Sequence, residues 1–444
     1  MEGGIIMSDQ KHQVKTSSSN FGAKGWLIII FSFLCILLDS SLINDSLNVV
    51  LKVFVATRGW SLTQLYAFSS ICSFISVLGA AMWGYMSNKT SIRLTWTVSL
   101  VITAVACFFW GRTNSIAVYF VCLAASTVGG MAFAYIANLN VISNWFPKKK
   151  GLAMGWVTIG FPLSAAVTSA AVGAVVSTGG LTKVYDIYGI IALVFAVFCY
   201  AFIRDYPEQA GAFPDNDKSF SKEEAERDLK QGLEYMKTSI WKPGKLFRTK
   251  RVWAIAFSLG IMELFSLGIM TNFVPRFLQA GYQQPEIFKM LGIAGILACF
   301  GSYFCGLLDA KLGTKKAIVI TWIVAIISII LDLIPTRPTQ YASLPFLAMM
   351  LGGASNYLVS FTNTVWGRYD FPMAYKVLKP MVAALGACGV AIVGIIGNTQ
   401  SYVMAYEVIG VLSVIALIVI ILTPDTKLGR DEEDFVKDEM SKEL

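Results

Sequence analysis

The chain has 444 residues, of which 55% are hydrophobic and only 14% are Asp, Glu, Lys or Arg. An average soluble domain carries about 25% charged residues, so this chain lacks the charge to solvate soluble domains of its length. The composition therefore excludes a soluble enzyme, a fibrous protein and a disordered scaffold. It favours a polytopic helical membrane protein.

Apolar runs separated by polar turns divide the chain into membrane-spanning segments, each long enough to cross about 30 Å of hydrocarbon. We predict an all-α membrane protein with twelve transmembrane helices in two pseudo-symmetric six-helix bundles. The predicted spans are 26–50, 62–86, 94–111, 115–143, 151–176, 183–203, 252–275, 287–309, 316–335, 343–366, 373–397 and 401–423.

The polar stretch between the sixth and seventh spans separates the two bundles. We predict an N-terminal tail over 1–25, a bundle over 26–203, a linker loop over 204–251, a second bundle over 252–423 and a C-terminal tail over 424–444. Within the linker, Ser221 and Glu224 have the spacing of a capping box, which predicts a surface helix beginning at Ser221.

The basic residues indicate the orientation. All but seven of the 36 Lys and Arg residues fall on the side of the predicted membrane that holds the tails and the linker. By the positive-inside rule both termini are cytoplasmic, and we expect a multi-pass protein of a bacterial plasma (cell inner) membrane. The net charge of +8 follows from this topology, so no nucleic-acid partner is expected.

An internal repeat relates the two halves. A shift of 222 residues aligns Gly59 with Gly281, Gly84 with Gly306 and Lys89 with Lys311. Two such halves in parallel orientation are typical of alternating-access transporters, in which the substrate site lies where the halves meet. A channel or a membrane enzyme gives no reason for this repeat.

Two loops suggest a family. GYMSNKTSIRL begins at Gly84, and its counterpart GLLDAKLGTKK begins at Gly306. Both resemble the Gly-x-x-x-Asp-Arg/Lys-x-Gly-x-Arg/Lys gating motif of the major facilitator superfamily, although Asn88 takes the acidic place in the first copy. The resemblance implies that these loops help to close the cytoplasmic side. The alternative is that their lysines only reflect the preference of basic residues for the cytoplasmic side. The implied gating residues are Lys89, Arg93, Asp309, Lys311 and Lys315.

Within that superfamily the chain resembles the oxalate/formate antiporter (carboxylate porter) family. NWFPKKKGLAMG, from Asn144, resembles the loop before the fifth helix of carboxylate porters, and Lys379 and Gly386 keep the Lys-to-Gly spacing of that family's eleventh helix. The resemblance implies that Lys379 binds an anionic substrate. An arginine that dicarboxylate members carry on the eighth helix is missing here, where Ser302 is the nearest match. The alternative for Lys379 is an interfacial anchor.

Two carboxyl groups lie midway along predicted spans. Asp39 is in the first span and Glu263 in the seventh, at nearly equivalent places of the repeat. Charge is costly inside the bilayer, so both are functional candidates, here for proton coupling. The one histidine, His12, is in the tail, which leaves any proton relay to carboxyl groups. The alternative role is packing between helices. Asp332 is expected near an outer, solvated end.

Uncharged polar residues on the first, fourth, seventh and tenth spans are candidates to line the cavity, because each can hydrogen-bond a carboxylate or hydroxyl. Their alternative role is to hold neighbouring helices together. The candidates for substrate binding, besides Lys379, are Tyr135, Asn138, Asn272, Asn356 and Tyr357, with Asn44 and Asn363 as further residues to test.

The predicted function is secondary active transport of a small organic anion, most simply a monocarboxylate because one fixed cation is available, by proton symport or anion exchange. The alternatives are a proton-coupled exporter of drugs or hydrophobic cations, and a transport-inactive membrane receptor. The sequence contains no P-loop, so the energy would come from gradients. We expect no catalytic site, metal or cofactor, and a monomer in the lipid bilayer.

Overall fold

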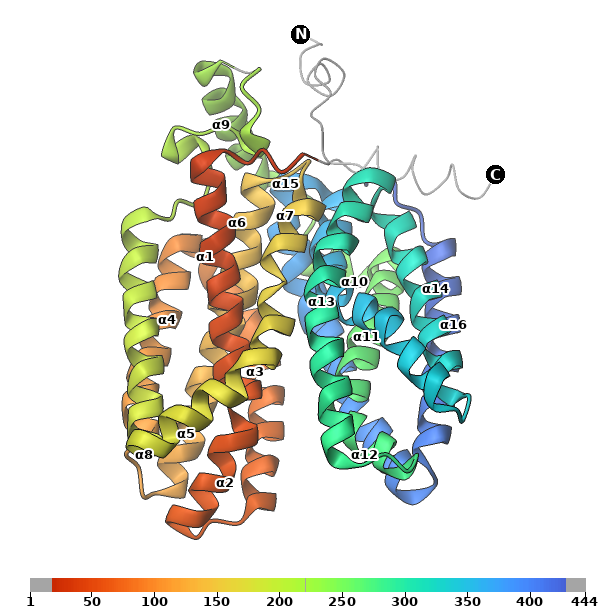
Figure 1. Cartoon of the computed structure of the whole chain (residues 1–444). Helices are drawn as coiled ribbons and strands as arrows, with labels where there is room; N and C mark the ends of the chain where they lie inside the picture. The colour runs from red at the N-terminus through yellow and green to blue at the C-terminus, as the bar shows by residue number, and fades with distance from the viewer. Residues whose placement is uncertain (1–17, 220, 429–444) are drawn as a thin grey trace.

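The computed structural model describes residues 18–219 and 221–428, and these are helical with short connections (Figure 1). Most of both predicted tails, His12 included, lies outside the described residues. The helices are α1 (Gly22–Ser40), π-helix η1 (Ser41–Asp45), α2 (Leu47–Arg58), α3 (Leu62–Lys89), α4 (Ile92–Trp110), α5 (Ile116–Gly130), π-helix η2 (Met131–Ile136), α6 (Ala137–Trp145), α7 (Lys150–Val157), α8 (Gly160–Phe202), 3-10 helices η3 (Glu208–Ala210) and η4 (Pro214–Asn216), α9 (Lys222–Thr238), α10 (Pro243–Arg248), α11 (Lys250–Thr271), α12 (Phe273–Gln279), α13 (Gln284–Leu312), α14 (Thr314–Leu333), α15 (Arg337–Thr399) and α16 (Tyr402–Leu422).

Ten segments of the described chain are long and apolar enough to cross a membrane. Two of them, with 53 and 63 residues, far exceed the roughly 20 residues of one crossing. Each contains one glycine in the left-handed region, Gly180 (φ 66°) and Gly367 (φ 72°), a conformation that costs glycine little. The chain doubles back at both glycines, so the ten segments make the twelve predicted crossings (Figure 1).

The two halves stand side by side, α1 to α8 in one and α11 to α16 in the other (Figure 1). We call the end of the bundle at which α9 lies the linker end, and the end at which α2 and α12 lie the far end. The internal repeat is visible in the helix bounds, since a shift of 222 residues carries α3 (Leu62–Lys89) onto all but the last residue of α13 (Gln284–Leu312). The all-helical, two-bundle prediction is confirmed.

The predicted linker helix is confirmed as α9. The Ser221 hydroxyl accepts a hydrogen bond from the Glu224 backbone N–H (3.1 Å), and the Glu224 carboxylate accepts one from the Ser221 N–H (2.8 Å). This capping box satisfies two backbone donors that a helix start otherwise leaves unpaired.

The linker is fixed to the C-terminal half at the turn inside α15. Arg368 forms a buried ion pair with Glu208, with both N–O distances at 2.9 Å. The next residue, Tyr369, donates a hydrogen bond of 2.9 Å to Asp228 of α9, and its ring lies against Gly232. Asp370 then accepts hydrogen bonds from Tyr235 (2.8 Å) and Ser239 (2.6 Å). Three consecutive residues of one turn therefore hold the linker.

The same linker also caps loops of the N-terminal half. The Asp205 carboxylate accepts hydrogen bonds from the backbone N–H groups of Ile92 (3.0 Å) and Arg93 (2.7 Å) at the start of α4. Asp215 accepts equivalent bonds from Lys148 and Lys149 just before α7. Carboxylates are favourable at helix starts, where unpaired N–H groups and the helix dipole are positive. The linker thus bridges both halves at the linker end.

Two expectations about the far end differ from the structure. The seventh span ends earlier than predicted, at Thr271, because the Asn272 side chain donates to the Gly268 carbonyl and ends α11. Asp332 is not solvated: it is 4% exposed and paired with Arg276 at 3.0 Å. A charge buried there is stabilised by its partner, which hydropathy alone does not reveal.

Candidate substrate-binding site

A group of ionisable side chains lies midway along the spanning helices, where the two halves meet. Lys379 Nζ donates to both carboxylate oxygens of Glu263, at 3.2 and 3.3 Å. The same ammonium lies 4.6 Å from the centre of the Tyr135 ring, a cation–π contact that crosses from the C-terminal to the N-terminal half. We call Asp39, Tyr135, Glu263, Tyr375 and Lys379 the central cluster.

The depth of the cluster follows from the helix geometry. At 1.5 Å per residue, Lys379 lies roughly 18 Å along its helix from the turn at Gly367, and Glu263 roughly 20 Å from the start of α11. Asp39 lies roughly 25 Å from the start of α1. Because the first crossing continues through η1 and α2 to Arg58, each of the three charges lies at least two helical turns from either end of its helical segment. Lys379 points at Glu263 rather than along its helix toward the linker end.

Asp39 lies on the N-terminal side of the cluster. Its carboxyl group is 5% exposed and lies against Gly130, where a Cβ atom would collide with it. Lys379 is the charged side chain that acts on Asp39 through space. A side chain at position 130 would displace this carboxyl group.

Both N-terminal helices that line the cluster contain a π-helical segment there. η1 begins directly after Asp39 and Ser40, and η2 begins directly after Gly130 and includes Tyr135. π-helical turns are rare and frequent at functional sites, because the wider turn leaves backbone groups less tightly paired and re-aims side chains. Their position beside the charges makes this region a candidate functional site.

Tyr375 is a cluster residue that the sequence analysis missed. It is 1% exposed, interacts electrostatically with Glu263 and Tyr135, and stacks on Phe371. The available signal was its spacing, because residues four apart share a helix face and Tyr375 precedes Lys379 by four. An aromatic residue in an apolar span resembles ordinary core, so the spacing alone did not single it out.

None of the four other predicted substrate-binding residues hydrogen-bonds Lys379 in the described structure: three bond to neighbouring helices, and Asn272 bonds within its own helix. Asn138 donates to the Ser32 carbonyl (3.0 Å), which joins α6 to α1. Tyr357 shares a hydrogen bond of 2.7 Å with Thr321, which joins α15 to α14. Asn272 bonds within its own helix end. Of the two further residues to test, Asn44 is exposed and Asn363 donates to Ser143 (2.9 Å).

Asn356 belongs to a hydrogen-bonded group that ties the halves together. It donates to the Ser302 carbonyl (3.0 Å) and accepts from Thr158. The Thr158 and Ser302 hydroxyls are 2.6 Å apart, and Ser302 donates to the Gly155 carbonyl (3.0 Å). Ser302 therefore joins α13 to α7. It stands at the place where the carboxylate-porter resemblance implies an arginine.

The predicted gating residues lie at the linker end. Asp309 accepts a hydrogen bond of 2.7 Å from Thr314 and packs against Gly151 of the other half. Lys89 lies 4.7 Å above the Tyr85 ring, and Arg93 lies 5.3 Å from the Tyr200 ring. Lys311 is exposed and Lys315 partly so. The structure thus brings Asp309 to the interface between the halves, and Lys89 shares the Tyr85 ring with Lys376 of the other half.

The halves are in close contact at the linker end. A Cβ atom at Gly155 would lie 3.0 Å from the Gly306 Cα, so α7 and α13 approach backbone to backbone. Lys150 donates to Thr364 across the interface (2.7 Å). Close packing of this kind closes the linker end between the halves.

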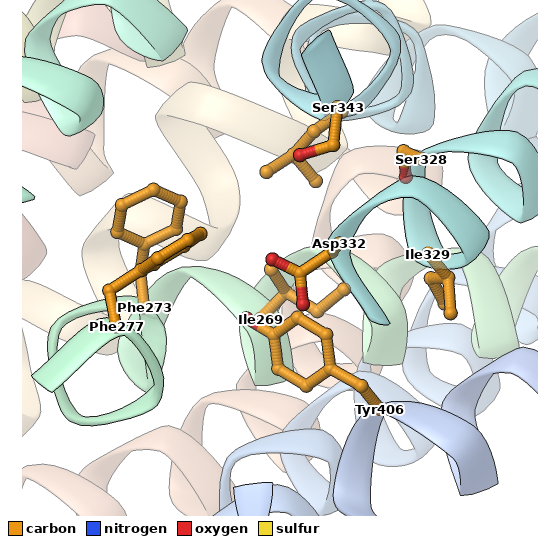
Figure 2. Close-up of a pocket in the computed structure, with 9 residues that line it drawn as sticks. Ile269, Phe273, Phe277, Ser328, Ile329, Asp332, Ser343 and Tyr406 are labelled. Atoms are coloured by element: carbon orange, nitrogen blue, oxygen red, sulfur yellow. The ribbon is translucent and has the colours of Figure 1, made fainter. Parts of the chain in front are cut away.

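A small cavity near the far end is a second candidate, entirely within the C-terminal half. The Asp332 carboxylate and the Tyr406 ring face it (Figure 2), and the space open to the centre of a water molecule is ≈ 10 Å³. That is room for about one water. The cavity is too small for an organic substrate, and its one carboxylate, Asp332, is already paired with Arg276.

The fold and the central cluster define a helical membrane transporter of the secondary type, built from two repeated halves around charges in mid-membrane. The chain belongs to the Major Facilitator Superfamily, whose family model matches residues 29–369. Members of this family are transporters and not enzymes.

Two curated relatives are similar to the chain at low identity. The Oxalate:formate antiporter of Oxalobacter formigenes is 21% identical over 270 residues, which are 60% of this chain and 58% of the antiporter. The Uncharacterized MFS-type transporter YhjX of Escherichia coli (strain K12) is 21% identical over 370 residues, 81% of this chain and 85% of that protein. The match thus spans less than two thirds of the antiporter.

Two solved structures share the fold. The human organic anion transporter MFSD10 (TETRAN) has a TM-score of 0.69 at 12% identity, covering 90% of this chain and 100% of that one. The proton:xylose symporter XylE bound to 6-bromo-6-deoxy-D-glucose has a TM-score of 0.69 at 16% identity, covering 93% and 98%. At these identities the likeness establishes the fold alone.

Proposed function

We propose that the protein carries a small organic anion with one carboxylate across the plasma membrane by alternating access, driven by proton symport or by anion exchange. The observation that carries this proposal is Lys379, an ammonium group in mid-membrane at the contact between the halves. A buried cation is costly, and a site that retains one in both a cation–π contact and an ion pair is suited to bind a carboxylate.

The charges elsewhere support a single carboxylate. Arg276 is paired with Asp332 near the far end, and Arg368 with Glu208 at the linker end. Among the described residues of the central cluster, Lys379 is the sole cation. A dicarboxylate would need a second cation to offset its second charge in a site of low dielectric constant. The Tyr135 and Tyr375 rings add apolar surface, so an aromatic acid is admissible.

The names of two similar proteins point the same way, one an oxalate:formate antiporter and the other an organic anion transporter. We also propose that the linker end is cytoplasmic, because most basic residues lie there. The closed linker end then corresponds to a carrier whose cytoplasmic side is shut. Asp39 and Glu263 are the proposed proton-coupling residues.

Uptake into proteoliposomes tests the function. We expect accumulation of labelled acetate, lactate or an aromatic monocarboxylate, and little accumulation of oxalate. Lys379→Ala should reduce the apparent affinity for the anion about 10- to 100-fold, because it removes a hydrogen bond to a charged group. Lys376→Ala, which removes a half-buried lysine of the same helix outside the cluster, is the control and should stay within about twofold of the wild type.

The second candidate is a proton-coupled exporter of hydrophobic cations or drugs. The two carboxyl groups of the central cluster, Asp39 and Glu263, favour it, since they outnumber the one cation there, Lys379. Accumulation of a lipophilic cation, with no carboxylate moved and with Lys379→Ala active, would replace the anion proposal by this one.

A further inference from the structure

Three ion pairs of the described residues each include a side chain that is less than 10% exposed, and their geometries differ. In Arg368–Glu208 both N–O distances are 2.9 Å, and Arg276–Asp332 is paired at 3.0 Å. In Lys379–Glu263 the distances are 3.2 and 3.3 Å. Charge-assisted hydrogen bonds between nitrogen and oxygen are usually about 2.7–2.9 Å, so the central pair is the loosest of the three.

Exposure separates the pairs in the same way. The side chains of Arg276 and Asp332 are 3% and 6% exposed, and those of Arg368 and Glu208 are 8% and 2% exposed. In the central pair Lys379 is 7% exposed, but Glu263 is 30% exposed. The carboxylate, and not the ammonium, is the accessible partner. Of the two partners, Glu263 is therefore the one with surface left for contact with a solute.

Glu263 packs against a glycine of α15. Its side chain lies against Gly386, where a Cβ atom would be 2.8 Å from the Glu263 Cγ. The glycine leaves room for this flexible side chain on the face of α15 that carries Lys379. The ammonium, by contrast, is held by its cation–π contact with Tyr135 of the opposite half.

We infer that Glu263 occupies, in the empty carrier, the position that the substrate carboxylate takes on Lys379, and that each bound anion displaces it and adds one proton to it. This inference rests on the proposed anion transport. The balance is one anion plus one proton: the pair is neutral when empty, and Lys379 ammonium, substrate carboxylate and protonated Glu263 are again neutral together. With Glu263 ionised, the loaded site would carry one unpaired negative charge in a medium of low dielectric constant, which is strongly unfavourable.

The charged and titratable groups around Glu263 come from the helices that pack against α11. α15 places Lys379 and Tyr375 beside it, and η2 places Tyr135 beside Lys379. α16, which also packs on α11, carries only one charged residue, Glu407, near its far-end start. α10 and α12 meet α11 at its two ends.

Asp39 has a different place. It makes no hydrogen bond with the described residues, lies against Gly130, and acts on Lys379 only through space. A substrate carboxylate that binds Lys379 does not have to displace Asp39. Asp39 thus remains the second candidate for proton coupling, and Glu263 is the group that exchanges with the substrate.

The test is to count protons per bound anion on the purified full-length chain. Binding of benzoate and lactate is measured by calorimetry at one pH in two buffers with different heats of ionisation. The wild type should take up close to one proton per anion, and its affinity should fall about tenfold per unit rise in pH, because one proton binds with each anion. Glu263→Gln should bind the anions with close to zero proton uptake and little dependence on pH. Asp39→Asn should keep close to one proton per anion.

The outcomes separate the two proposals. Anion binding by the wild type that depends on Lys379 but takes up no proton overturns the role of Glu263 and leaves anion transport standing. Proton uptake that persists in Glu263→Gln and disappears in Asp39→Asn transfers the role to Asp39. If the wild type binds no monocarboxylate, the proposed function itself fails. Should Glu263→Gln fail to fold, the count in Asp39→Asn decides: close to one proton per anion keeps the role with Glu263, and close to zero transfers it to Asp39.

Discussion

Arg368 donates two hydrogen bonds of 2.9 Å to the two carboxylate oxygens of Glu208, so the turn inside α15 is fixed to the linker by a buried ion pair. Both side chains are less than a tenth exposed. Because the linker also caps α4 and the loop before α7, this pair connects the C-terminal half to loops of the N-terminal half.

Glu208→Gln should destabilise the docked linker by about 3–5 kcal/mol, because it leaves the Arg368 charge buried without its counter-charge. We expect a lower midpoint of thermal unfolding in detergent and faster hydrogen exchange in α9. Glu226→Gln is the matched control, since its pair with Lys222 is exposed and 3.8 Å long. It should change stability by less than about 1 kcal/mol. Equal effects of the two substitutions would contradict a structural role for the buried pair.

Gly232→Ala should displace α9 from the turn at Tyr369, because the new Cβ would collide with the Tyr369 ring. Limited proteolysis of the linker should become several-fold faster. Gly244→Ala, in α10, adds a Cβ that meets nothing within 4 Å and serves as the control. Adding Tyr369→Ala to Gly232→Ala should restore the protection in part, and a lack of any rescue would count against this contact as the cause.

Asp215 makes linker docking sensitive to pH. Burial raises the pKa of the Asp215 carboxyl group to about 6 from 3.8, although the backbone N–H groups of Lys148 and Lys149 stabilise its charge. The docked state therefore holds this proton more tightly than the free chain does. The stabilisation from this proton is present below about pH 4 and is lost as the pH rises to about 6.

Hydrogen exchange at residues 212–217 should accordingly quicken relative to the intrinsic rate between pH 4 and 6. Asp215→Asn keeps an acceptor oxygen and tolerates the left-handed backbone at this position (φ 57°), so it should fold and remove this dependence. A dependence that persists in Asp215→Asn would assign it to another group.

Gly306→Ala should prevent full closure of the linker end. A Cβ there would lie 2.5 Å from the Gly151 carbonyl oxygen and 2.7 Å from the Gly155 Cα. Because backbone cannot yield as a flexible side chain does, we expect transport in proteoliposomes to fall at least tenfold and exchange in α7 to rise. Gly292→Ala lies in the same helix with nothing within 4 Å and should transport normally. Normal transport by Gly306→Ala would show that this close approach is dispensable.

The sequence by itself predicted the twelve crossings, the 222-residue repeat and the capped linker helix, and it singled out Asp39, Glu263 and Lys379 as charges within the predicted spans. These features depend on hydropathy, spacing and the cost of charge in lipid, which are local properties of the chain. The repeat matched α3 to α13 almost residue for residue for the same reason.

Only the tertiary structure decided which of these residues meet. Lys379 and Glu263 are 116 residues apart, and their contact depends on how α11 and α15 are rotated and packed. The same packing turned Asn138, Asn356 and Tyr357 toward neighbouring helices and added Tyr375 to the central cluster. A helix face is chosen by close contacts with several partners at once, and no single segment contains that information.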